Sequence, residues 1–166
     1  MKFLGIAAAV AALSGCATTI VPTVNLVAKY DEQQAITLLK DGTNTIKGNA
    51  FMRQRGGGVV TCAGSPVFLV PATDYATERV TVLYGNATGG VSIRNALFNP
   101  DYPSYAKNAK RTICDSSGNF QFDKVADGSF FAGTHVTWTA GTVQGGGMMS
   151  RAVVKDGQTI SLVMAN

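Results

Sequence analysis

One stretch of the sequence decides the fold class: Cys-Asp-Ser-Ser-Gly-Asn-Phe-Gln-Phe-Asp-Lys-Val-Ala-Asp-Gly-Ser-Phe-Phe, residues 114–131. Phe120 and Phe122 stand two residues apart, so both side chains of an extended strand would point to the same face. Gly118 provides a turn before this strand, and Gly128 opens the next turn. The stretch therefore predicts a short strand with one buried face, held between two tight turns.

The same alternation of apolar and polar residues continues on both sides of this stretch. It marks eight short strands, at residues 45–52, 59–62, 67–70, 111–114, 119–122, 130–139, 150–154 and 159–164. Residues that favour turns separate them, namely Gly56-Gly57-Gly58, Gly64-Ser65-Pro66, Ser116-Ser117-Gly118, Asp127-Gly128, Gly145-Gly146-Gly147 and Asp156-Gly157. We predict a mainly β protein with one domain over residues 30–166, an antiparallel β-sandwich.

Two segments interrupt the strand pattern. Residues 32–40 follow Asp31, carry apolar side chains at one helical spacing and end at Asp41-Gly42, which is typical of a short helix. The stretch 72–84 fits a helix or a strand, and we favour a helix. Residues 85–110 are rich in Gly, Asn and Pro and are expected to form the longest irregular segment. The sandwich should thus carry a short N-terminal helix and a long insertion over residues 72–110.

The stretch around Phe120 resembles the signature of the carboxypeptidase regulatory-like, transthyretin-like β-sandwich family, which reads D-x-x-G-x-F-x-F-x-x-V-x-x-G-x-Y. Residues 46–51 and 64–71 are similar to the first two strands of that family. The resemblance implies a transthyretin-like sandwich that serves as an accessory, folding or binding module without catalysis. The N-terminal helix, the insertion and the glycine-rich last hairpin depart from the family and leave the ligand and the partner open.

The first sixteen residues have the parts of an export signal. Lys2 precedes an apolar run from Phe3 to Leu13, and these eleven residues would span about 16 Å as a helix, too little to cross a bilayer. The ending Leu13-Ser14-Gly15-Cys16 resembles the lipobox of bacterial lipoproteins; an ordinary signal peptide that carries a cysteine is the alternative. The resemblance implies a signal peptide at 1–15, a lipid on Cys16 and a tether at 16–29. Since Ala17 is not aspartate, it also implies anchoring in the outer membrane facing the periplasm, with the cell surface as the alternative.

The two remaining cysteines form an even pair in a chain bound for an oxidising compartment. We therefore expect a disulfide between Cys62 and Cys114. Two buried thiols or a redox pair are the alternatives, although no Cys-x-x-Cys spacing supports a redox pair. The chain is mildly basic, with 14 Lys and Arg against 10 Asp and Glu. These cations are spread along the sequence without the dense runs of nucleic-acid-binding proteins, so no nucleic acid partner is expected. They indicate a solvated surface, with contact to anionic lipid or polysaccharide near the membrane as the alternative.

No set of residues predicts catalysis, a metal or a cofactor. His135 is the one histidine, and no His-x-His or carboxylate cluster accompanies it. The serines stand in no Gly-x-Ser-x-Gly elbow, and the glycine triplets have no P-loop lysine. We therefore expect a protein that is not an enzyme, with an enzyme based on His135 as a minor alternative.

Aromatic residues with basic neighbours mark the insertion. They are Tyr75, Tyr84, Phe98, Tyr102 and Tyr105, near Arg94, Lys107 and Lys110. The candidate ligand contacts, to glycan or protein, are Tyr102, Tyr105, Lys107 and Lys110; alternatively, the rings fold the insertion onto the sandwich. Our leading hypothesis is a non-enzymatic cell-envelope lipoprotein that acts as a structural or protein-interaction module with an envelope protein partner. Binding of carbohydrate or peptidoglycan is the alternative.

Overall fold

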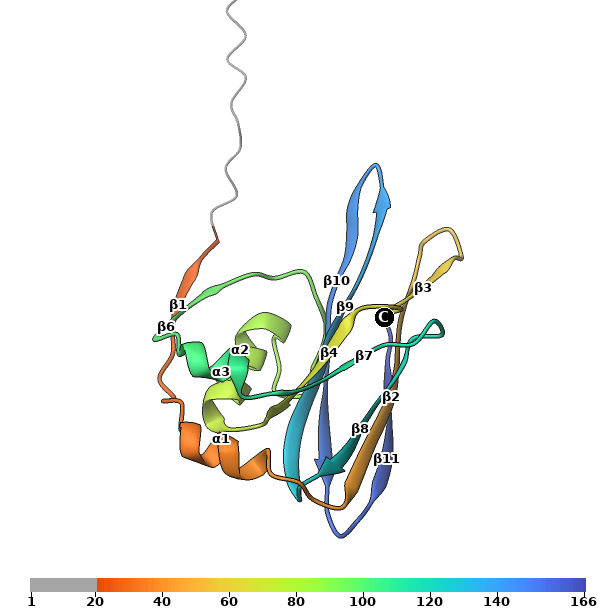
Figure 1. Ribbon diagram of the computed structural model, residues 1–166. Helices are drawn as coiled ribbons and strands as arrows, with labels where there is room; N and C mark the ends of the chain where they lie inside the picture. Colours follow the sequence, from red (N-terminus) through yellow and green to blue (C-terminus); the bar gives the residue numbers. More distant parts are fainter. Residues whose placement is uncertain (1–20) are drawn as a thin grey trace, which may run out of the picture.

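The computed structural model describes residues 21–166 and shows a two-layer β-sandwich (Figure 1). The predicted signal peptide and Cys16 lie outside these described residues. The first sheet has the order β5-β10-β9-β4-β7, built from Gly89–Ser92, Thr142–Val154, Gly128–Ala140, Pro66–Pro71 and Lys110–Ile113. The second has the order β11-β2-β3, with β8 also paired to β2, built from Thr159–Met164, Asn44–Arg53, Val59–Thr61 and Asn119–Val125. The predicted mainly β sandwich is confirmed. Its first sheet is antiparallel throughout, whereas β11 runs parallel to β2.

The core lies between the two sheets and follows the alternation of the strands. In β2 the side chains of Ile46, Ala50 and Met52 are buried, and their neighbours in sequence face outward. Phe120 and Phe122 of β8 fill the same core with their rings 6.0 Å apart. Gly48 leaves the space for the Phe120 ring, because a Cβ atom at this glycine would lie 2.1 Å from Cζ of that ring. The stretch that decided the fold class thus supplies two of the largest core side chains.

All eight predicted strands are present, but one predicted turn is wrong. Gly145-Gly146-Gly147 does not separate two strands; it lies inside β10, which pairs with β9 over its whole length. The hairpin instead turns at Gly141, which has a φ of 74°. Three short strands were also missed: β1 (Thr23–Asn25), β5 and β6 (Leu97–Asn99).

The two predicted helices are confirmed as α1 (Glu32–Leu38) and α2 (Asp74–Tyr84). The side chain of Asp31 caps α1 by accepting a hydrogen bond from the backbone N–H of Gln34. The prediction of an irregular segment after α2 is wrong in part, since this segment contains β5, β6 and a third helix, α3 (Pro103–Lys107). The helices cover the outer face of the five-stranded sheet (Figure 1). The first half of β9 is therefore buried on both faces, with Phe130 turned to the core and Phe131 turned to the insertion.

Part of the predicted tether packs on the domain. β1 pairs in parallel with β6, and Leu26 is buried. The carboxylate of Glu78 on α2 accepts hydrogen bonds from the backbone N–H groups of Val27 and Ala28, at 2.8 to 3.1 Å. These hydrogen bonds lower the pKa of Glu78. The chain is thus fixed to the insertion before α1 begins.

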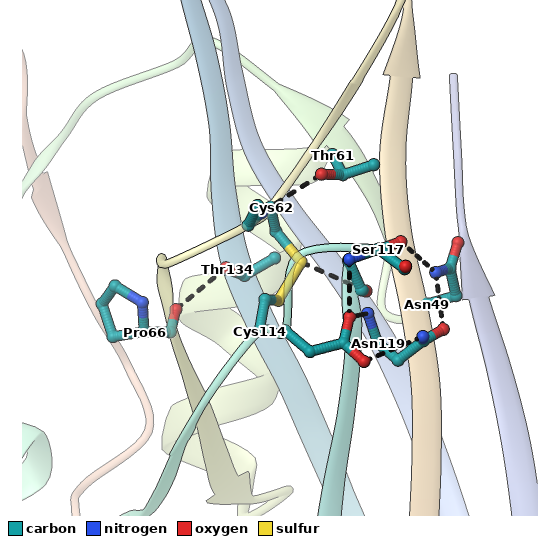
Figure 2. Close-up of a disulfide and its surroundings, with 11 residues drawn as sticks. Asn49, Thr61, Cys62, Pro66, Cys114, Ser117, Asn119 and Thr134 are labelled. Carbon is teal, nitrogen blue, oxygen red and sulfur yellow. Dashed lines mark hydrogen bonds between the residues drawn. A yellow bond between two sulfur atoms is a disulfide. The ribbon is translucent and has the colours of Figure 1, made fainter.

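A disulfide joins the edges of the two sheets. Cys62 follows β3 and Cys114 follows β7, and their Cα atoms are 5.8 Å apart (Figure 2). Both side chains are buried. The predicted Cys62–Cys114 pair is therefore confirmed. After Cys114, the carboxylate of Asp115 accepts hydrogen bonds from the backbone N–H groups of Ser117 and Asn119, which shapes the turn into β8 and lowers the pKa of Asp115.

None of the helices within residues 21–166 is long and apolar enough to cross a membrane.

Candidate functional site

A cleft opens on the outer face of the five-stranded sheet, between the insertion and β10. Its volume is about 600 Å³. Its walls come from the end of α2, from the segment that joins β5 to β6, and from the first half of β10. It is lined by Arg79, Leu83, Tyr84, Ser92, Ile93, Arg94, Asn95, Ala96, Phe98, His135, Val143 and Gly145 to Gly147. Two of these lining residues are arginines, and none is acidic, so the cleft is basic.

The glycine triplet of β10 forms one wall, and backbone atoms approach Gly145 and Gly146 too closely for a side chain there. A Cβ atom at Gly145 would lie 2.1 Å from the carbonyl oxygen of Val136, and one at Gly146 would lie 2.5 Å from that of Ser92. A Cβ atom at Gly147 would lie 3.0 Å from the hydroxyl of Tyr84. Glycine inside a strand often marks such close approaches. Here Gly146 and Gly147 let the insertion sit directly on the sheet, and Gly145 lets β9 approach β10 closely.

Tyr84, Arg94 and His135 present polar groups at this wall. The Tyr84 hydroxyl and Nε2 of His135 both lie within 4 Å of the Cβ position of Gly147. Burial raises the pKa of Tyr84, so its hydroxyl is a neutral hydrogen-bond donor at physiological pH. The side chain of Arg94 is exposed, and among the described residues its guanidinium has no ion-pair partner. These groups are available to a ligand.

Ser92 holds the segment that carries Arg94. Its hydroxyl donates to the carbonyl oxygen of Leu83 at the end of α2 and accepts from the backbone N–H of Arg94 at 3.0 Å. Gly85 ends α2 in the left-handed conformation, with a φ of 78°, and Nη1 of Arg94 lies 3.6 Å from its Cβ position. The backbone next to Arg94 is therefore positioned, while its side chain is free.

Arg79 has a different role from Arg94. Its guanidinium lies 4.1 Å from the ring centroid of Phe98 and 4.6 Å from that of Tyr105. It forms an ion pair of 2.7 Å with Asp101 and donates a hydrogen bond to the Tyr75 hydroxyl. Burial alone would lower the pKa of Arg79, but these hydrogen bonds raise it. Arg79 fixes α2, β6 and α3 to one another and turns the Phe98 ring toward the cleft.

Four tyrosines surround this arginine and explain most of the aromatic pattern. The rings of Tyr30, Tyr75, Tyr102 and Tyr105 pack with centroids 5.3 to 5.8 Å apart. Tyr75 is fully buried, and burial raises the pKa of Tyr105 to about 12. For these side chains, the structure therefore agrees with the alternative from the sequence analysis, in which the aromatic rings pack the insertion onto the sandwich.

The four candidate ligand contacts do not converge on the cleft. Tyr102 and Tyr105 belong to the tyrosine cluster. Nζ of Lys110 donates to the carbonyl oxygen of Lys124 at 2.7 Å and lies 3.4 Å from Asp41. Lys107 is exposed at the end of α3. A ligand contact at these residues stays a prediction.

Sequence reasoning named Tyr84, Arg94 and Phe98 as part of a broader aromatic set, but it missed the cleft itself. The sequence feature that could have indicated the cleft is the glycine triplet at residues 145–147, which lies within a strand. Within the described residues, no group of three His, Cys, Asp or Glu side chains is placed to hold a metal ion.

A second groove, of about 530 Å³, crosses the outer face of the β11-β2-β8 sheet. Its amide side chains bond to one another: Nδ2 of Asn49 donates to Oδ1 of Asn119, and Nδ2 of Asn119 donates to Asp115. Figure 2 shows this chain of amides beside the disulfide. The amide donors of this groove are therefore already used within the protein.

No protein-family model and no curated protein matches the chain. Among solved structures, the fold is similar to that of a protein from Pseudomonas aeruginosa described as a "putative carbohydrate binding protein", with a TM-score of 0.65 and 19% sequence identity. The similarity covers 84% of this chain and 99% of that one. At this identity the similarity supports the sandwich fold.

Proposed function

We propose that this protein is a non-catalytic binding protein of the cell envelope that holds an acidic glycan in the basic cleft. The observation that carries the proposal is the guanidinium of Arg94, which has no ion-pair partner among residues 21–166, in a cleft whose lining has no acidic side chain. An arginine can bind a carboxylate with two parallel hydrogen bonds, which gives both affinity and orientation.

The other lining groups suit a sugar ring. Tyr84 supplies a hydroxyl, and His135 supplies a ring nitrogen that can accept or donate a hydrogen bond. Phe98 supplies an apolar ring, and the glycines let a ligand approach the backbone. A few polar groups placed within an otherwise apolar concave surface are typical of small-molecule sites. The description of the Pseudomonas aeruginosa protein as carbohydrate-binding agrees with this proposal.

The envelope location in this proposal rests on the export signal and the lipobox resemblance. A lipid on Cys16 would hold the domain at the outer membrane, where acidic polysaccharide is within its reach. The resemblance to the carboxypeptidase regulatory-like family supports the absence of catalysis.

The glycan proposal is tested by isothermal titration with a chain that begins at Ala17 and so keeps every described residue. The probes are a uronic-acid hexasaccharide and a neutral hexasaccharide of the same length. We expect the acidic probe to bind the protein and the neutral probe to bind at least ten-fold more weakly. Replacing Arg94 with alanine should weaken binding of the acidic probe about ten-fold or more, since a charge-assisted hydrogen bond contributes about 1.5–3 kcal/mol.

The matched control is Lys155→Ala, which removes an exposed cation from the turn between β10 and β11. If Lys155→Ala weakened binding as much as Arg94→Ala, the effect would be one of net charge and the cleft would not be the site. Equal binding of the acidic and neutral probes would refute recognition of a carboxylate.

A second candidate function is protein interaction through the outer face of the β11-β2-β8 sheet. Ile113 and Val163 line the groove there and are 66% and 72% exposed. Apolar side chains beside satisfied amides suit a protein partner better than a sugar. Crosslinking in envelope extracts tests this candidate. Val163→Lys should abolish a specific crosslinked partner, whereas Arg94→Ala should retain it; the opposite result would place the partner at the cleft.

A further inference from the structure

Four segments that are far apart in the sequence meet at one end of the sandwich. They are the chain before α1, the β2–β3 hairpin, the segment between β5 and β6, and the β9–β10 hairpin. Arg53 and Arg55 share a surface hollow with Trp138 and Gln144. The basic cleft joins the β5–β6 segment to the same β10 hairpin, and the backbone N–H of Leu97 donates to the carbonyl oxygen of Pro22. In Figure 1 both hairpins and the start of the described chain point toward the top of the view.

The charged side chains that these four segments themselves carry are all positive; Glu78, whose carboxylate accepts from the backbone of Val27, and Asn166, which bonds to the backbone of Arg53, come from elsewhere in the chain. Residues 21–27, 53–60, 91–98 and 137–147 contain three arginines and no Asp or Glu. The arginines are Arg53, Arg55 and Arg94, and all three are exposed. At the opposite end, by contrast, Asp127 accepts hydrogen bonds from Asn44 and from the backbone N–H of Asp156, and Asp41 lies beside Lys110 and Lys124. The two ends of the sandwich thus differ in charge.

Apolar side chains stand exposed between these arginines. Ile93 is 79% exposed, Val143 is 75% exposed and Val59 is 59% exposed. Each lies in a hairpin or connecting segment at this end. Exposed apolar side chains flanked by cations are typical of surfaces that enter the interface of an anionic bilayer.

The N-terminal part of the chain leaves the domain at the same end. The described chain begins at Val21, five residues after Cys16. Five residues reach at most about 18 Å even when fully extended. A lipid on Cys16, as the sequence predicts, would therefore keep this end close to the membrane surface.

We propose that this end of the sandwich rests on an anionic phospholipid bilayer. Arg53 and Arg55 pair with headgroup phosphates, and the exposed apolar side chains at this end enter the interface. The partner is the surface of the membrane to which the chain is tethered. This proposal does not depend on glycan binding, because Arg53 and Arg55 do not line the basic cleft.

The test uses the chain that begins at Ala17, which carries no lipid, so that any membrane binding comes from the domain itself. Co-sedimentation is measured with vesicles of phosphatidylglycerol and phosphatidylethanolamine and with vesicles of phosphatidylcholine. We expect binding to the anionic vesicles only, and loss of that binding in 0.5 M salt, at which the Debye length is only about 4 Å. The double variant Arg53→Glu/Arg55→Glu should lower partitioning at least about thirty-fold, since each arginine near such a surface contributes about five-fold.

The matched control, Lys40→Glu/Lys155→Glu, makes the same change in net charge at two exposed lysines away from these four segments. It should retain most of the binding. Equal loss in both double variants, or no binding of the unsubstituted chain to anionic vesicles, would overturn the proposal. Arg53→Glu/Arg55→Glu should leave titration with the acidic hexasaccharide unchanged, so failure of one proposal does not decide the other.

Discussion

The two glycine triplets allow the role of the cleft wall to be tested with a matched pair of substitutions. Gly57 and Gly145 have almost the same φ, 90° and 91°. No other atom lies within 4 Å of the Cβ position of Gly57, whereas the carbonyl oxygen of Val136 lies 2.1 Å from that of Gly145. Replacing each glycine with alanine therefore places a side chain at the same positive φ, but only one substitution adds a steric clash.

The expected magnitudes follow from these two contributions. A non-glycine residue in the left-handed region costs about 1–2 kcal/mol, and this cost applies to both variants. The clash at Gly145 is with backbone, which must move, and such overpacking costs about a further 1–3 kcal/mol. We expect Gly145→Ala to lower the free energy of unfolding by about 2–5 kcal/mol, and Gly57→Ala by about 1–2 kcal/mol.

Chemical unfolding in urea, followed by the fluorescence of Trp138, measures both losses. The chain contains one tryptophan, and it lies on β9 beside the affected pairing. Titration with the acidic hexasaccharide adds a second readout: Gly145→Ala should weaken binding, and Gly57→Ala should not. If the two variants lost the same stability, the close contact between β9 and β10 would not be what requires glycine, and the reasoning would be refuted.

Three further predictions concern the disulfide, the N-terminal segment and the arginine of the tyrosine cluster. Cys62→Ala/Cys114→Ala should lower the free energy of unfolding by about 4 kcal/mol, because the disulfide closes a segment of 52 residues. As a control, reductant should destabilise the unsubstituted chain but not this variant. The pKa of Glu78 is lowered in the folded chain, so its contribution to stability is present above its ordinary value of 4.5 and is lost as the pH falls through the lowered value. The protection of residues 26–29 against hydrogen exchange, relative to an unfolded chain at the same pH, should therefore decrease there, while in Glu78→Gln this protection should lack the pH dependence. Arg79→Met should speed hydrogen exchange in β6 and α3 about 100-fold and leave exchange in β2 unchanged. The reason is that two cation–π contacts and a charged hydrogen bond together contribute about 3 kcal/mol. Unchanged exchange in α3 would show that Arg79 does not fix the insertion.

The sequence predicted the sandwich because its strands have one face in the core and one in solvent. In β2, and in β8 from Asn119 to Asp123, this arrangement produces strict alternation, which is visible without any knowledge of the partner strands. The three missed strands lack this signal. β1 and β6 are three residues long and pair only with each other, and β5 is paired along the glycine-rich part of the sheet edge. Their pairing depends on where the insertion folds.

The wrong turn at Gly145 to Gly147 has the same origin. Gly56 to Gly58 is an identical tripeptide, and it does form a hairpin turn. The difference lies in what approaches each triplet from elsewhere in the chain: Ser92 and Tyr84 approach the second one. Local sequence alone predicts a turn equally well in both places, because glycine is favoured both by turns and by close packing.

The two arginines of the cleft show why the site was harder to predict than the fold. Arg79 and Arg94 both stand in the insertion near aromatic residues, and nothing in the sequence separates them. The structure uses Arg79 to join Phe98, Tyr105 and Asp101, and leaves the guanidinium of Arg94 exposed. An arginine that is already paired has little left to offer a ligand, whereas an exposed one can exchange water for a carboxylate. Because pairing of this kind depends on contacts across the fold, residue type and spacing could indicate the aromatic and basic region but not which of its cations remains free to bind.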